Sequence, residues 1–75
     1  MVSFETMKSE EVKFKENKFI EIARKKAITD EGETIFISLS SGFITQNGEK
    51  RYRKSFSLPV DDEVLEFVSK KIREV

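Results

Sequence analysis

Apolar and polar residues alternate along much of this chain, which is the pattern of β-strands with one buried face. Such runs cover residues 12–15 (VKFK), a segment that starts at Lys18, residues 34–44 (TIFISLSSGFI) and residues 50–58. In the third run Gly42 interrupts the alternation, which indicates a bulge or the close approach of another backbone. The pattern therefore predicts four strands.

Polar turn sequences separate these strands. Residues 16–17 and the segment TDEGE at residues 29–33 contain no apolar side chain, and each is typical of a turn. Asn47-Gly48 predicts a hairpin with a type I′ turn, because both residues tolerate a positive φ. Pro59 ends the fourth strand, since it has no N–H to donate to a neighbouring strand.

After Pro59 the apolar spacing changes to three and four residues, which predicts an amphipathic helix that begins near Asp61. Acidic residues stand at its start and basic residues at its end, as the helix dipole favours. A chain of 75 residues buries little of this stripe by itself. We therefore expect the helices to hold a homodimer together through Val64, Leu65, Val68 and Ile72.

Together these elements predict an α+β fold, with a four-stranded antiparallel sheet followed by one C-terminal helix (β-β-β-β-α). Residues 1–11 show no sustained period, and we interpret them as a flexible N-terminal arm. Residues 12–75 then form a single domain.

Composition narrows the range of functions. The chain has no histidine and no cysteine, which excludes Ser-His and Cys-His catalysis. The acidic groups at residues 30–33 and 61–63 are best explained as a turn and a helix start, so we expect neither an enzyme nor a cofactor or metal. Apolar runs are far shorter than the roughly twenty residues of a membrane span. We expect a cytoplasmic, nucleoid-associated protein, or a nuclear one in a eukaryote.

The cluster KRYRK at residues 50–54 is the strongest functional signal. Strict alternation would place Arg51 and Arg53 on one face, roughly 6.6 to 6.8 Å apart, and Tyr52 on the other face with Lys54. Cations spaced along phosphates, together with rings on which bases stack, are typical of single-strand binders. Basic residues on an exposed strand also discourage aggregation, and fourteen Lys+Arg are balanced by fourteen Asp+Glu. The residues alone leave both interpretations open.

The order and spacing of the segments resemble a known family. VKFKENKFIEIARK, TIFISLSSGF and NGEKRYRKSFSLP, followed by the helix, are similar to the single-stranded-DNA-binding domain of the transcriptional coactivator family called positive cofactor four, over about residues 12–74. The resemblance implies a curved sheet, a homodimer through the helices, and binding of single-stranded or melted DNA over concave sheet faces, in transcription or genome maintenance. The same topology occurs in the plant Whirly and purine-rich-element-binding groups.

Three positions match the family's pattern: Lys18 at the start of the second strand, Phe43 after the third strand, and Arg53-Lys54 before the segment SFSL. Two positions depart from it, because Ser40 replaces an arginine and residues 51–53 replace a Pro-Gly segment. These departures bear on the affinity and the register of binding that the resemblance implies.

The resulting hypothesis is a single-stranded-DNA-binding protein of low sequence specificity, which binds DNA or RNA and contacts the transcription machinery. Its expected nucleic-acid contacts are Lys18, Phe36, Phe43, Lys50, Arg51, Tyr52, Arg53 and Lys54. One alternative is a protein-interaction module that docks an acidic partner through the basic hairpin, which the zero net charge favours. Another is a purely structural protein that binds neither.

Overall fold

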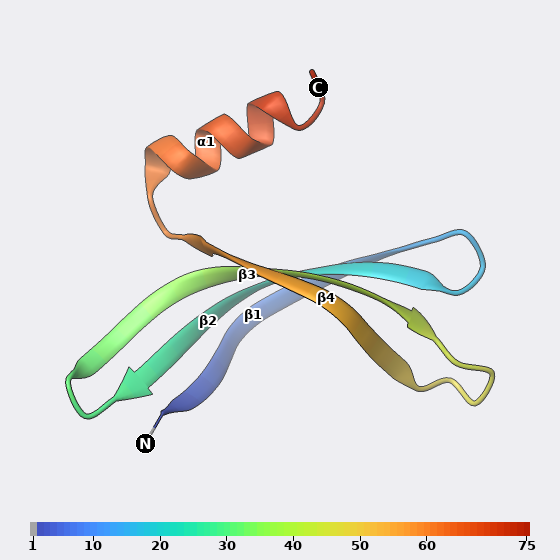
Figure 1. Cartoon of the computed structure of the whole chain (residues 1–75), viewed down its shortest axis with the longest axis horizontal. Helices are drawn as coiled ribbons and strands as arrows, with labels where there is room; N and C mark the ends of the chain where they lie inside the picture. The colour runs from blue at the N-terminus through green and yellow to red at the C-terminus, as the bar shows by residue number, and fades with distance from the viewer. Residues whose placement is uncertain (1) are drawn as a thin grey trace.

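The computed structural model describes residues 2–75 and contains a four-stranded antiparallel open sheet followed by one helix (Figure 1). The strands lie side by side in the order β1-β2-β3-β4. Their bounds, with that of the helix, are β1 Ser3–Phe14, β2 Lys18–Thr29, β3 Gly32–Ile44, β4 Lys50–Pro59 and α1 Asp62–Lys71. This confirms the predicted order of elements and the antiparallel sheet.

The first strand is longer than the sequence pattern indicates. Residues 3–11, which we expected to form a flexible arm, belong to β1, and this strand pairs with β2 from Ser3 opposite Ile28 to Phe14 opposite Lys18. Every residue of β1 is exposed, so backbone hydrogen bonds hold this edge strand in place rather than burial of its side chains. Because side chains that are not buried need not alternate between apolar and polar, the alternation pattern did not indicate a strand at residues 3–11. Met1 lies outside the described residues.

The turns lie where the sequence predicts them, at residues 15–17, 30–31 and 45–49. The prediction of a type I′ turn was wrong, because Gly48 has a positive φ of 85° but Asn47 does not. Gly48 N–H donates to Thr45 O at 2.9 Å and Thr45 N–H donates to Glu49 O at 2.8 Å. This is the pattern of a type I turn followed by one left-handed residue. The longer loop needs a positive φ at the glycine alone.

A bulge interrupts the pairing of β4 with β3. The register shifts between Ser41 and Gly42, and Arg53 is the extra residue. The β4 backbone comes very close here, since a Cβ on residue 42 would overlap the carbonyl oxygen of Arg51. This confirms the interpretation of Gly42 as the site of a bulge and of a close backbone contact.

The bulge exchanges the faces that strict alternation predicts for part of β4. Alternation would place Arg51 on the face of Ser55 and Tyr52 on the opposite face. In the structure Tyr52 lies opposite Gly42, on the face of Ser55, whereas Arg51 lies opposite Phe43. The predicted faces of Arg51 and Tyr52 were therefore wrong, because the unpaired Arg53 reverses the alternation on one side of the bulge relative to the other.

The sheet is strongly curved, as contacts that skip strands show. The hydroxyl of Tyr52 on β4 reaches Glu21 on β2, and Lys50 on β4 reaches Glu11 on β1. Adjacent strands lie about 4.8 Å apart, so β1 and β4 of a flat sheet would be too distant for such a contact. The sheet therefore bends toward the face that carries these residues, which we call the concave face. The opposite, convex face carries the alternate residues, among them Ile20, Ile22, Ile37 and Leu39.

Burial is concentrated on the concave face. Phe19 and Ala23 are its buried apolar residues, and Ser38 and Ser40 are buried beside them. On the convex face Ile22 is 53% exposed. A single chain therefore covers its polar, serine-bearing face and leaves much of its apolar face open.

Helix α1 begins at its predicted position. The Asp61 Oδ1 atom accepts hydrogen bonds from the backbone N–H groups of Glu63, at 2.9 Å, and Val64, at 3.2 Å, which is a regular N-cap. The helix contacts only β4 among the strands, and none of its residues is buried. Figure 1 shows it standing clear of the arched sheet. Among residues 2–75, no helix has the length and apolar character needed to cross a membrane.

Candidate nucleic-acid interface

The residues selected from the sequence divide between the two faces of the sheet. Strand pairing aligns Lys18, Phe43 and Arg51 on the convex face, at the end of the sheet that carries the β1–β2 and β3–β4 turns (Figure 1). Lys50 and Tyr52 lie at the same end of the sheet but on the concave face. One basic hairpin therefore presents two different surfaces.

Phe43 is the centre of the convex group. Lys18 lies opposite it on β2 and Arg51 lies opposite it on β4, while the Arg53 guanidinium carbon stands 5.9 Å from the centre of its ring. Phe14, which pairs with Lys18, lines a hollow of about 430 Å³ together with Phe43. We call these five residues the Phe43 cluster. The β4 bulge is what brings Arg51 and Arg53 to this face.

The cations at this end of the convex face are little neutralised. Arg51 forms an ion pair of 3.1 Å with Glu49, but both side chains are exposed, and such pairs contribute little. In the part of the chain that the structure describes, Lys18, Arg53 and Lys54 have no carboxylate partner within ion-pair distance. Lys54 lies opposite Ser41, one step from the cluster. These groups remain available to an external anion.

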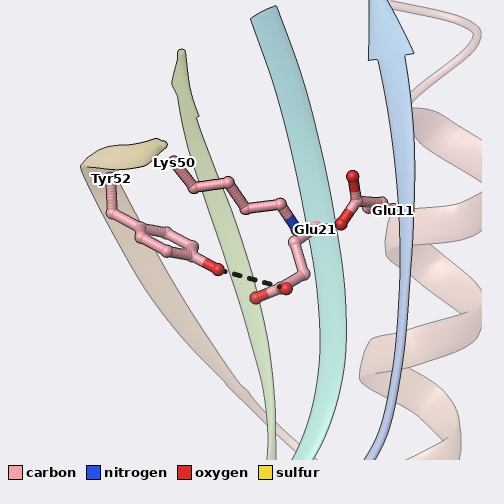
Figure 2. Close-up of polar contacts among 4 residues, drawn as sticks. All are labelled: Glu11, Glu21, Lys50 and Tyr52. Atoms are coloured by element: carbon pink, nitrogen blue, oxygen red, sulfur yellow. Dashed lines mark hydrogen bonds and ion pairs between the residues drawn. The ribbon is translucent and has the colours of Figure 1, made fainter. Parts of the chain in front are cut away.

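The concave residues are held differently. The Tyr52 ring meets the buried Phe19 ring edge to face, with centroids 5.3 Å apart, and the Lys50 ammonium lies 5.3 Å from the Phe19 centroid. Tyr52 donates a hydrogen bond of 3.2 Å to Glu21, and Lys50 donates one to Glu11 (Figure 2). Both polar groups therefore already have carboxylate partners.

The pKa values of Lys50 and Tyr52 reflect these partners. The hydrogen bond that Lys50 donates to the Glu11 carboxylate raises the pKa of Lys50 above its usual 10.5, because it favours the charged ammonium. Partial burial raises the pKa of Tyr52 above its usual 10.0, and the Glu21 carboxylate raises it further by disfavouring the phenolate. Both groups stay protonated at neutral pH.

Phe36 does not join either group. It lies opposite Pro59 on β4, toward the other end of the sheet, and packs edge to face against Phe4 with centroids 6.2 Å apart. Phe4 belongs to the segment expected to be an arm, so the sequence offered no partner for Phe36. Of the expected nucleic-acid contacts, Phe36 is the one that the fold separates from the rest.

Several residues of the site were not selected from the sequence. Phe14 joins the Phe43 cluster, and Glu11 and Glu21 bind Lys50 and Tyr52. The contact of Glu21 with Tyr52 depends on the bulge, which turns Tyr52 to the concave face. Glu11 lies in the segment expected to be a flexible arm, so nothing in the sequence indicated that it contacts Lys50. No group of three or more Asp and Glu side chains that suits a metal ion occurs within residues 2–75.

Comparisons with known proteins found no match to this chain among family profiles, curated proteins or solved structures. The resemblance to the positive cofactor four family therefore stays a hypothesis that rests on the short segments quoted above. The functional argument has to come from the geometry of the chain itself.

Proposed function

We propose that this protein binds single-stranded nucleic acid, preferentially DNA, with low sequence specificity. The observation that supports this most directly is the Phe43 cluster, where Lys18, Arg51 and Arg53 surround one aromatic ring. Unpaired strands are bound by this combination of cations for the backbone and a ring for the bases. Because every base has a face that stacks, low sequence specificity follows.

In this proposal the cations of the cluster bind phosphates while Phe43 supports a base. The Arg53 guanidinium already lies near the ring, and an arginine in that position also stacks on bases. The resemblance implied binding over the concave face, whereas the cations of the Phe43 cluster lie on the convex face. We place the backbone of the bound strand there, at the end of the sheet formed by the two hairpin turns.

The test is a titration of labelled oligo(dT) at several salt concentrations, with Arg51→Ala and Arg53→Ala as variants. Each variant is expected to weaken binding and to reduce the slope of log K against log salt by about 0.7, the value for one lost phosphate contact on a single strand. The matched control is Arg24→Ala, which removes the same charge from the convex face near Ile37. An Arg51→Ala slope equal to that of Arg24→Ala contradicts the role of the cluster.

A protein-interaction module is the second candidate function. The specific observation in its favour is that Lys50 and Arg51 of the basic hairpin already pair with Glu11 and Glu49, in a chain of zero net charge. Duplex DNA and RNA oligonucleotides of the same length complete the titration. If the protein binds none of the oligonucleotides at low salt, the interaction module replaces nucleic-acid binding as the better explanation.

The same proposal includes a homodimer, because one chain leaves its apolar surface uncovered. Phe67 of α1 is 62% exposed, Ile72, which caps the end of α1, is 63% exposed, and Phe56 on the convex face is 63% exposed. The convex face also contains a hollow of about 410 Å³ whose apolar lining includes Val12, Ile20, Ile22 and Ile37. The helix of a second copy has the same exposed apolar residues and could cover this surface, so the hydrophobic effect favours association of two copies.

The predicted interface residues Val64, Leu65 and Val68 are half-buried in one chain, and Ile72 is exposed. Ile72→Glu should therefore convert the dimer to a monomer without disturbing contacts within the chain, as measured by sedimentation equilibrium. Lys70→Glu, on the opposite side of the helix, is the control and should stay dimeric. A wild-type protein that sediments as a monomer at high concentration rules the dimer out.

A further inference from the structure

A second hollow adjoins the one beside Phe43, and its lining has a different chemistry. It measures about 520 Å³ and is lined by Glu16, Asn17, Phe43, Ile44, Thr45 and Gln46. We call it the turn hollow, and the one of about 430 Å³ in the Phe43 cluster the cluster hollow. Phe43 and Asn17 line both. The two hollows therefore meet at these residues, at the end of the sheet that carries the β1–β2 and β3–β4 turns (Figure 1).

Hydrogen bonds fix the backbone on both sides of the turn hollow. The Ile44 N–H donates to Asn17 O at 2.7 Å, which joins the β1–β2 turn to the end of β3. In the β3–β4 loop the Thr45 Oγ1 atom accepts from the Glu49 N–H at 3.1 Å. Within residues 2–75 no hydrogen bond or ion pair engages three polar side chains of the hollow, those of Glu16, Asn17 and Gln46. These side chains are available to a ligand.

The two hollows differ in charge. Two cations, Lys18 and Arg53, line the cluster hollow, and no carboxylate of the described chain lines it. The turn hollow has one charged group among residues 2–75, the Glu16 carboxylate. A phosphate is therefore attracted to the first hollow and repelled from the second. The nearby charged residues that line neither hollow are Lys15, Glu49 and Arg51.

This division of charge orients a bound strand. A strand that crosses both hollows keeps its phosphates near the cations of the cluster hollow, and it turns an uncharged base toward Glu16. Lys18 follows Asn17 in the chain and lies opposite Phe43, so it is placed to bind the phosphate between the two nucleotides.

The polar groups of the turn hollow match the Watson–Crick edge of guanine. That edge has two adjacent N–H donors, N1–H and the N2 amine, beside the O6 acceptor. A carboxylate accepts two parallel N–H bonds at once, as it does from an arginine, and an amide NH₂ donates to O6. Adenine and cytosine have one amine beside a ring acceptor, and thymine has one N–H between two carbonyls. Guanine alone therefore offers a pair of donors to one carboxylate.

We propose that the turn hollow is a guanine subsite of the nucleic-acid interface. Glu16 accepts from the N1–H and the N2 amine of an unpaired guanine, and the Asn17 amide donates to its O6. The neighbouring nucleotide of the strand stacks on Phe43. This inference rests on the proposed function and adds to it a preference at one position of the bound strand.

The first experiment places one guanine inside a short oligo(dT) and compares the affinity with that of oligo(dT) carrying adenine, cytosine or hypoxanthine at the same place. The guanine strand should bind wild type about fivefold more tightly than oligo(dT), the lower end of the range for a bidentate base contact. Hypoxanthine keeps N1–H and O6 but lacks the N2 amine, so it should lose most of this gain. Equal affinities for guanine and hypoxanthine, or tighter binding of adenine, overturn the assignment.

The second experiment measures the ratio of the guanine and oligo(dT) affinities in Glu16→Gln. The ratio should fall toward one, because the glutamine amide cannot accept two hydrogen bonds side by side. Glu31→Gln is the matched control, since it removes the same charge from the turn at the opposite end of the sheet and should keep the ratio. A ratio within one variant cancels the general effect of net charge on affinity. Equal ratios in the two variants overturn the role of Glu16.

The contact with O6 is tested by Asn17→Asp, which keeps the shape of the side chain but replaces the donor with an acceptor. The ratio should fall, whereas Asn47→Asp, in the other loop and outside the lining of the hollow, should keep it. Thermal unfolding of each variant establishes that folded proteins are compared. A ratio that Asn17→Asp leaves unchanged overturns the O6 contact.

Failure of the subsite is distinguishable from failure of the proposed function. A wild-type ratio of one, with oligo(dT) binding that still depends on Arg51, overturns the guanine subsite and leaves the proposed function intact. Absence of binding to every oligonucleotide overturns both.

Discussion

The carbonyl oxygen of Arg51 on β4 occupies the space where a side chain of residue 42 on β3 would begin, so the bulge in β4 depends on Gly42. A Cβ at this position would also stand 3.0 Å from the Cα of Tyr52. Gly42→Ala should therefore destabilise the protein by about 1 to 3 kcal/mol, the range for overpacking a close contact. Urea unfolding followed by circular dichroism measures the change.

Ser41→Ala is the control for this substitution, because it alters the neighbouring residue without adding a Cβ. Its effect on the free energy of unfolding should be smaller than that of Gly42→Ala. If Gly42→Ala unfolds at the same urea concentration as wild type, the close approach of the two backbones does not require a glycine at position 42.

Ionisation of Tyr52 reports on the concave face directly, because it is the only tyrosine in the chain. Burial and the Glu21 carboxylate raise its pKa above 10.0, so the phenolate absorbance should appear with a midpoint above that pH. A raised pKa in the folded state favours the neutral phenol, so its stabilising effect is complete below pH 10 and is lost as pH rises through the folded midpoint. Glu21→Gln should lower the midpoint toward 10.0.

The raised pKa values also make the stability of the folded protein depend on pH. The pKa of Lys50 is also raised, by its hydrogen bond with Glu11, so its ammonium loses the pairing as pH rises above 10.5. Thermal unfolding should therefore show stability falling above about pH 10, and Tyr52→Phe should reduce that fall by removing one of the two groups. A wild-type Tyr52 midpoint below 10.0 would show that the phenol is not shielded as described.

The N-cap of α1 gives a prediction about local stability. Asp61→Ala removes the acceptor of two backbone hydrogen bonds, and it should cost about 1 kcal/mol. Asp61→Asn keeps a capping oxygen and should recover most of this loss, whereas Asp62→Asn, inside the first turn, should have a smaller effect. Melting temperatures of the three variants provide the measurement. If Asp61→Ala and wild type have the same melting temperature, the helix contributes little to the stability of the unit that unfolds cooperatively.

The role of Phe43 in stacking is tested by Phe43→Leu, which keeps an apolar side chain but removes the aromatic face. Binding of oligo(dT) should weaken by about 1 to 3 kcal/mol, the range for one stacked base. Phe56→Leu is the matched control, because Phe56 is an exposed ring on the same face but lies opposite Leu39, away from the cluster. Equal losses in the two variants would count against a base on Phe43.

Local physics explains why the elements of the fold were predictable from the sequence. The turns at residues 15–17, 30–31 and 45–49, the stop at Pro59 and the cap at Asp61 are decided by the conformational preferences of a few neighbouring residues. Such preferences do not require knowledge of distant partners. The bulge at Gly42 was predictable for the same reason, since an isolated glycine in a strand often indicates a bulge or the close approach of another backbone.

Strand β1 shows where that kind of reasoning fails. Alternation predicted only its last residues, 12–14; residues 3–11 are exposed on both faces and follow no apolar period, and their place in the sheet comes from backbone hydrogen bonds with β2. Backbone groups are the same in every sequence. Residues 3–11 of this edge strand are therefore recognised only in the tertiary structure, and they include Glu11, the partner of Lys50.

What the sequence determined by itself was the set of local elements, their order and the presence of a basic hairpin, because these depend on contacts between residues close in the chain. What only the tertiary structure decided was the face on which each basic or aromatic side chain lies. One extra residue, Arg53, reverses the alternation of β4, and the curvature of the sheet brings Glu11 and Glu21 to side chains two or three strands away in the sheet order. Both are long-range effects of how the whole sheet pairs and bends, and no short segment contains them.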